Sequence, residues 1–169
     1  ELLALRAAGV PCEVVPGISS AIAIPELAGI PVTHRGLSRS FHVVTAHSAA
    51  TGDTLPENLD ALARTGGTLV FLMGLSALGE LSRRLIAAAV VSGGNSPHPA
   101  DVRGTLADIA ERAAEVEAPA VIVVGAVAEL SLADTSLPLS GVRVALTGTD
   151  AVQSKLRALF SAAGARVFS

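Results

Sequence analysis

Two hydroxyl groups follow a tight turn near the start of the chain, in the run VVPGISS (residues 14–20). An apolar stretch, a proline–glycine turn and a serine pair predict a strand, a turn and the start of a helix. Backbone N–H groups and the hydroxyls of Ser19 and Ser20 at such a junction face a ligand beyond the carboxyl end of the strand. The same residues suit an ordinary helix capped by serine, so both interpretations stay open.

A second loop, THRGLSR (residues 33–39), brings together His34, Arg35 and Arg39. Planar guanidinium groups bind carboxylates and phosphates with two parallel hydrogen bonds. In a chain with only 12 Lys and Arg residues, this cluster indicates an acidic ligand. A solvated connector of the same composition is the alternative.

Two further positions lie where strands are expected to end. Met73 follows an apolar run, and its soft, adaptable thioether suits the wall of an adenine or tetrapyrrole pocket. Gly93 and Gly94 follow another apolar run, and glycine permits close approach of a ligand to the backbone. On spacing alone, core packing is the favoured interpretation of Met73, and a plain turn is the favoured interpretation of Gly94.

Several other chemistries are excluded by spacing. The four histidines lack Cys or carboxylate partners at metal-ligand spacing, so no metal site is expected. No Ser-His-Asp arrangement and no Gly-x-Ser-x-Gly motif is present. Gly148-Thr149-Asp150 lacks the further glycines of a dinucleotide-binding fingerprint and indicates a helix cap.

Composition narrows the class of protein. The chain has 169 residues, is 50% hydrophobic, and has no Trp or Tyr and a net charge of −3. Without aromatic platforms or a basic field, nucleic-acid binding is not expected. The longest apolar stretch, residues 118–127, is too short to cross a membrane, and one cysteine, Cys12, fits the reducing cytoplasm. The chain begins at Glu1 without Met, which we interpret as a truncation or an unobserved upstream segment.

Apolar runs alternate with helical periodicity, which is typical of α/β architecture. The expected strands cover residues 12–15, 41–45, 68–73, 89–92, 120–130 and 142–147, with another beginning at Val167. The expected helices cover residues 2–8, 19–28, 59–62, 76–88, 105–116 and 150–164. At Ala87-Ala88-Ala89 a helix would pass directly into a strand, which is unusual, and we suspect missing residues there.

Taken together, these stretches resemble one known family. The run EVVPGISSAIAIPELAGIPVTHRGLSRSFHVVTAH (residues 13–47) resembles the tetrapyrrole methylases, and among them the uroporphyrinogen-III C-methyltransferases. The runs GGTLVFLMGLSAL, VRGTLADIAER and PAVIVVGAVAEL continue the match in the same order to about residue 130. The resemblance implies the tetrapyrrole methylase fold, with two α/β domains and a cleft between them.

The resemblance also implies a reaction and its residues. The donor is S-adenosyl-L-methionine, leaving S-adenosyl-L-homocysteine, and uroporphyrinogen III is methylated twice to precorrin-2 for sirohaem or cobalamin. Ser19, Ser20, Met73 and Gly94 would contact the donor, and Arg35 would bind a substrate carboxylate. The catalytic residues are expected upstream of Glu1, so we expect the chain alone to be inactive. A cytoplasmic homodimer without nucleic-acid or membrane partners is expected.

The tail GVRVALTGTDAVQSKLRALFSAAGARVFS (residues 141–169) is similar to the first strand–helix unit of uroporphyrinogen-III synthase. We therefore expect residues 1–38 to end a first methylase domain, 39–131 to form the second, 132–140 to be a linker and 141–169 to begin a synthase-like domain. Two other functions stay open: a non-catalytic, partner-binding module of the same pathway, and a related methylase with another substrate.

Overall fold

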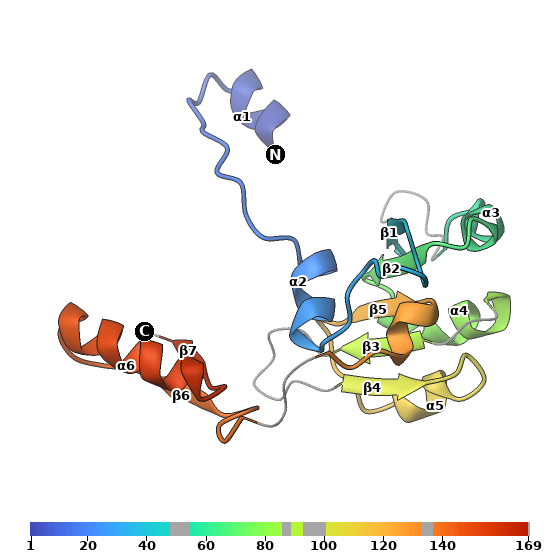
Figure 1. Ribbon diagram of the computed structural model, residues 1–169. Helices are drawn as coiled ribbons and strands as arrows, with labels where there is room; N and C mark the ends of the chain where they lie inside the picture. The colour runs from blue at the N-terminus through green and yellow to red at the C-terminus, as the bar shows by residue number, and fades with distance from the viewer. Residues whose placement is uncertain (48–54, 86–88, 93–100, 133–136, 169) are drawn as a thin grey trace.

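The computed structural model describes residues 1–47, 55–85, 89–92, 101–132 and 137–168, with the backbone alone for 89–92. Its centre is a five-stranded mixed sheet in the order β1-β2-β5-β3-β4 (Figure 1). The strands are β1 (Phe41–Thr45), β2 (Thr68–Leu72), β3 (Ala89–Ser92), β4 (Asp101–Gly104) and β5 (Val121–Val124). This mixed α/β sheet confirms the expected fold class.

The pairing of the strands puts several strand ends at one edge of the sheet. β1 and β2 are parallel, whereas β5 is antiparallel to both β2 and β3. Leu72 and Ser92 both pair with Val121, the first residue of β5. The chain therefore leaves β1, β2 and β3 and enters β5 at the same edge, which we call the Met73 edge.

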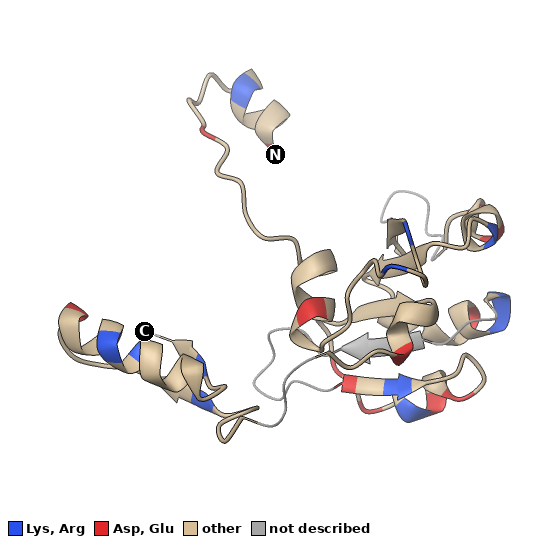
Figure 2. Ribbon diagram, in the orientation of Figure 1, with Lys and Arg blue, Asp and Glu red and all other residues tan. Residues whose placement is uncertain are grey.

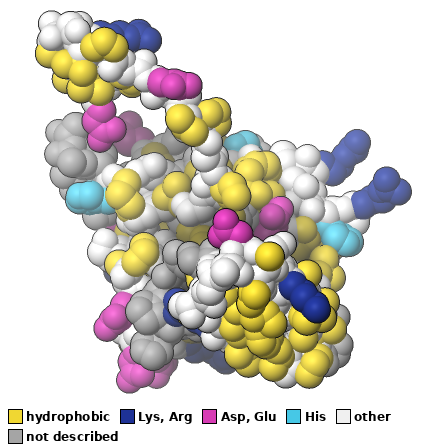
Figure 3. Space-filling view, turned by 90° about the vertical axis from the view of Figure 1, so that its left-hand side faces the viewer, with side chains coloured by type: hydrophobic (Ala, Val, Ile, Leu, Met, Phe, Trp, Pro, Cys, Tyr) yellow, Lys and Arg dark blue, Asp and Glu magenta, His cyan; other side chains and the backbone are white. Residues whose placement is uncertain are grey.

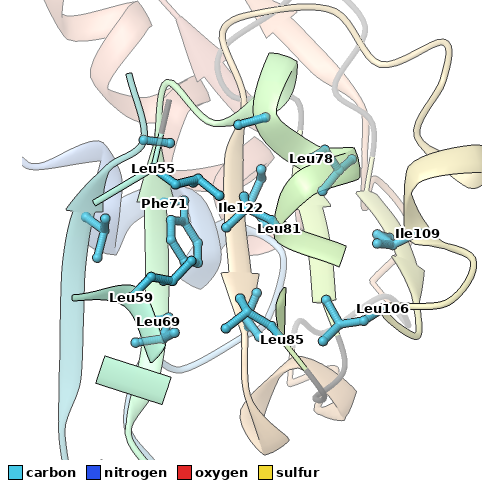
Figure 4. Packing of buried hydrophobic residues seen from close by; sticks show 14 of the residues in the cluster. Leu55, Leu59, Leu69, Phe71, Leu78, Leu81, Leu85, Leu106, Ile109 and Ile122 are labelled. Carbon is cyan, nitrogen blue, oxygen red and sulfur yellow. The ribbon is translucent and has the colours of Figure 1, made fainter. Parts of the chain in front are cut away.

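Alternating side chains give the sheet two buried faces. On one face, Leu69, Phe71 and Ile122 pack with residues of the helices α3 (Leu59–Arg64), α4 (Leu78–Arg84) and α5 (Ile109–Arg112) (Figure 4). On the other face, Val70, Val121 and Val123 pack under α2 (Ser20–Leu27) and the short 3-10 helix η2 (Ala126–Glu129). Strands that are buried on both faces read as continuous apolar runs, as β2 and β5 do.

The helix α2 has the boundaries that its sequence predicts. The hydroxyl of Ser19 accepts a hydrogen bond from the N–H of Ala21 at 3.3 Å, which caps the first turn. Gly29 ends the helix with a φ of +72°, a conformation that glycine adopts at little cost. Ala21 and Ile30 are buried against the five-stranded sheet. Residues 20–30 thus share a core with the unit expected at 39–131, and the domain boundary in the whole protein stays a prediction.

The segment before α2 differs from its prediction. α1 (Leu2–Ala7) forms as expected, but residues 12–15 form no strand and all of residues 1–19 are exposed. In Figure 1 this segment extends away from the sheet. A strand is stable only with a partner, and no described strand lies beside residues 12–15.

The C-terminal unit is a strand–helix–strand motif. β6 (Arg143–Ala145) and β7 (Arg166–Phe168) are parallel and are joined by α6 (Asp150–Ala162). This confirms the strand and helix expected after residue 141 and the strand at Val167. The unit lies to one side of the main sheet in Figure 1, and α6 buries none of its residues. Figure 3 views the molecule from this side and shows a cluster of hydrophobic side chains at the surface.

Candidate functional site

A pocket of about 840 Å³ opens at the Met73 edge of the sheet. Its described lining is mostly apolar, with two polar residues: His47, Met73, Leu75, Ser76, Ala118, Pro119 and Ala120. Large apolar pockets with few polar groups are the usual binding sites of small organic ligands. Pockets beyond the carboxyl ends of strands are the usual ligand sites of α/β sheets.

The backbone at Met73 is unusual. Its φ of +54° places a non-glycine residue in the left-handed region, which costs free energy and is often retained at functional sites. The residue is 61% exposed, so core packing does not explain it. The next residue, Gly74, leaves room for Ile122, because a Cβ there would lie 3.1 Å from its Cδ1.

The other predicted donor contacts are placed in part. Ser19 uses its hydroxyl as the cap of α2, which confirms the capped-helix interpretation without testing the ligand role. Ser19 and Ser20 are exposed and are not among the described residues that line the Met73 pocket. Gly94 lies outside the described residues. Ser92, two residues before it, ends β3 at the Met73 edge.

Arg35 lies at the tip of a short hairpin that precedes β1. His34 and Ser38 form an antiparallel bridge, and the N–H of Leu37 donates to the carbonyl of His34 at 3.1 Å. Gly36 has a φ of +87°, as the third position of a type II turn requires. Arg35 therefore occupies the second position, where its exposed side chain projects from the corner of the turn.

Around this hairpin lies a second pocket, of about 570 Å³. It is lined by Thr33, His34, Arg35, Gly36, Ser38 and Arg39. The structure thus brings together all three basic residues of the cluster that the sequence indicates. Figure 2 shows basic residues on the loop that leads into β1.

One organising residue was missed by the sequence analysis. The guanidinium group of Arg103 on β4 donates to the carbonyls of Ala28 at 2.8 Å and Leu130 at 2.6 Å. It also pairs with Asp101 at 3.0 Å. It thereby joins the end of α2 to the end of η2. The sequence offers one sign of this residue, a single arginine among apolar and small residues in the run VRGTL. That sign does not reveal which distant carbonyl groups the arginine binds.

Two absences concern the described residues alone. No group of three or more His, Cys, Asp or Glu side chains there could hold a metal ion. None of the helices there is long and apolar enough to span a bilayer.

Comparison with known proteins identifies relatives. A sequence profile of the tetrapyrrole (corrin/porphyrin) methylases matches residues 1–126. A uroporphyrinogen-III C-methyltransferase of Methanocaldococcus jannaschii is 41% identical over 138 residues, covering 75% of this chain and 56% of the relative. A sirohaem synthase of Gluconacetobacter diazotrophicus is 41% identical over 151 residues, covering 83% of this chain and 32% of the relative.

Among solved structures, a uroporphyrin-III C-methyltransferase of Thermus thermophilus, complexed with S-adenosyl homocysteine, superposes with a TM-score of 0.61. It is 32% identical, and the match covers 75% of this chain and 57% of that structure. The chain therefore spans about half the length of the uroporphyrinogen-III methyltransferases it matches.

Proposed function

The chain belongs to the tetrapyrrole methylase family, and on that premise we propose that the protein is an S-adenosylmethionine-dependent uroporphyrinogen-III C-methyltransferase. It would transfer two methyl groups to uroporphyrinogen III and give precorrin-2. The observation that carries the proposal is the 840 Å³ pocket at the Met73 edge, in a chain 41% identical to a named uroporphyrinogen-III C-methyltransferase.

The Met73 pocket suits the methyl donor. Its apolar lining and its volume fit a nucleoside, and the exposed thioether of Met73 offers a soft surface for a purine or a sulfonium group. Ser19 and Ser20 at the start of α2, and Gly94 after β3, would complete the donor contacts. A relative crystallised with S-adenosyl homocysteine supports this choice of ligand.

Catalysis of this reaction depends more on positioning the donor and the substrate than on covalent catalysis by the protein. A nucleophilic pyrrole carbon attacks the methyl carbon in line, the carbon–sulfur bond breaks, the sulfonium becomes a neutral thioether, and the pyrrole ring loses a proton. Holding the two partners in line accounts for much of the acceleration. Within this chain we assign the positioning of the methyl group to the donor contacts. Arg35 would bind a substrate carboxylate through its guanidinium fork. Its hairpin lies at the start of β2 and Met73 follows the end of that strand, so Arg35 would hold the periphery of the substrate and not the reacting carbon.

We further propose that residues 141–169 correspond to the first strand–helix unit of a uroporphyrinogen-III synthase-like domain, with 132–140 as a linker and a methylase domain boundary near residue 38. The parallel β6 and β7 and the unburied α6 support this assignment. Fusion to the enzyme that makes uroporphyrinogen III would supply the substrate directly. The cytoplasmic location and the homodimer stay predictions. Light scattering of the purified protein tests the homodimer.

The test is methyl transfer by the protein expressed from its complete reading frame. With labelled S-adenosylmethionine and uroporphyrinogen III, we expect a product carrying two added methyl groups. Exchange of uroporphyrinogen III for a later corrin precursor is the substrate control. Methylation of the corrin precursor alone would assign the protein to a different methylase, and binding of both ligands without transfer would favour a non-catalytic module.

A further inference from the structure

The pocket around the hairpin of residues 34–38 is lined by a second arginine, Arg39, to which the proposed function assigns no role. Arg39 follows Ser38, whose side chain is buried, and both Arg35 and Arg39 are exposed on the wall of the same 570 Å³ pocket. Neither arginine makes an ion pair with any described residue. Two unpaired guanidinium groups on one pocket wall create a local positive field in a chain of net charge −3.

The hairpin fixes the backbone positions from which the two arginine side chains extend. The type II turn places Arg35 at its corner, and the bridge between His34 and Ser38 closes the loop. The hydroxyl of Ser38 accepts a hydrogen bond from the N–H of Thr68 at 3.1 Å, which anchors the loop to the start of β2. Because the backbone of the loop is anchored, ligand binding has to order the two arginine side chains and not the loop itself.

We propose that Arg35 and Arg39 form a two-point clamp for a pair of neighbouring carboxylates on one pyrrole ring of the substrate. Each ring of uroporphyrinogen III carries an acetate and a propionate on adjacent carbons. Each carboxylate can take both hydrogen bonds of a guanidinium fork. Arg39 would then be a specificity-determining residue, since it distinguishes rings with two carboxylates from rings with one. This inference rests on the proposed function for the identity of the ligand.

The clamp can be tested by binding, without catalysis. Uroporphyrin III is the stable, fluorescent probe with two carboxylates on each ring, and coproporphyrin III has a methyl group in place of each acetate. We expect the chain to bind uroporphyrin III more tightly than coproporphyrin III. Arg39→Ala should weaken uroporphyrin binding by about threefold to tenfold and leave coproporphyrin binding within about twofold. Arg39→Lys should recover only part of the loss.

A matched control is Arg83→Ala, which removes an exposed positive charge from α4, outside the pocket. It should change uroporphyrin binding by less than about twofold. Raising the salt concentration should weaken binding less steeply in Arg39→Ala than in the parent chain. Equal losses in Arg39→Ala and Arg83→Ala, equal binding of the two porphyrins, or no uroporphyrin binding by the parent chain would each overturn the clamp.

The clamp and the proposed function can fail separately. If the full reading frame methylates uroporphyrinogen III while Arg39→Ala keeps the parent's affinity for uroporphyrin, the function stands and the clamp falls. If the two porphyrins and the variants bind as expected but no methyl transfer occurs, the clamp stands and the enzymatic assignment falls.

Discussion

Ser38 and Thr68 join two segments that are thirty residues apart, through a hydrogen bond of 3.1 Å from the N–H of Thr68 to the hydroxyl of Ser38. The same hydroxyl donates to the carbonyl of Ser40 at 2.8 Å. Both Ser38 and Thr68 are buried. The N–H of Thr68 also donates to the carbonyl of Ser40 at 3.0 Å. The arginine hairpin is therefore held to the start of β2 by the buried hydroxyl of Ser38 together with this backbone contact.

Ser38→Ala should destabilise the protein and loosen the hairpin. The variant removes both hydrogen bonds of the hydroxyl, and we expect a loss of about 1–2 kcal/mol in the free energy of unfolding. Urea denaturation measures it. Ser40→Ala is the matched control, because its side chain is exposed and its carbonyl is retained. An equal loss in the two variants would show that the buried hydroxyl has no special role.

Arg103→Ala should be more costly than the loss of an ordinary surface arginine. Its guanidinium group satisfies the carbonyls of Ala28 and Leu130 at the ends of two helices, and we expect unfolding to become easier by about 2–3 kcal/mol. Arg103→Lys should recover less than half, because an ammonium group cannot reproduce the planar fork. Among the described residues, Arg83 bonds only to Gly79 in its own helix, so Arg83→Ala should shift the urea midpoint little.

Met73 allows stability to be separated from ligand binding. Its φ of +54° disfavours every side chain, so Met73→Gly should be more stable than Met73→Ala by about 0.5–1 kcal/mol. If Met73 contacts the methyl donor, both variants should bind S-adenosylhomocysteine more weakly than the parent. Thermal unfolding and calorimetric titration of the complete protein give the two readouts. Donor affinity that follows stability across the variants would contradict a direct contact.

Much of the fold could be predicted because its signals are local. Ser19 and Gly29 delimit α2, and the bounds of β1 and β3 agree with their predicted ranges. Other elements depend on neighbours. β4 was not predicted, since Asp101–Gly104 reads as a charged loop and becomes a strand by pairing with β3. The strand expected to Leu130 ends at Val124, where Gly125 turns with a φ of +141° into η2.

The predicted bounds of the helices agree less well with the structure than those of β1 and β3. α4 begins at Leu78 after a 3-10 turn over Leu75–Ala77, two residues later than the expected start at residue 76. α3 begins at Leu59 as expected but continues to Arg64. Residues 87–88, where a helix was expected to pass directly into a strand, lie outside the described residues. α5 covers only Ile109–Arg112, a much shorter helix than expected.

The candidate site was predictable in composition but not in shape. Residue type and spacing indicated the cluster of Arg35 and Arg39, and the structure places both on one pocket. The left-handed backbone of Met73 and the entry of His47 into its pocket depend on where three strands end. A local sequence pattern does not show which distant segments the fold brings together.

The last prediction concerns Asp108, which precedes α5. The carboxylate accepts hydrogen bonds from the hydroxyl of Thr105 at 2.9 Å and from its N–H at 2.7 Å, and it pairs with Arg112 at 2.6 Å. The hydroxyl of Thr105 is the main cause that lowers the pKa of Asp108 below its ordinary 3.8, with the backbone N–H of Thr105 and Arg112 adding to it against partial desolvation.

Because the pKa is lower in the folded state, the charged carboxylate stabilises the fold above pH 3.8. That contribution is lost as the pH falls through the lowered pKa. At neutral pH, Asp108→Asn should therefore be less stable than the parent, and the difference in urea midpoint should narrow below pH 3.8. Arg112→Ala is the discriminating variant: it keeps the hydrogen bonds from Thr105, so most of the pH dependence should remain. A difference between parent and Asp108→Asn that stays constant across the acid range would show that the carboxylate does not titrate differently in the folded chain.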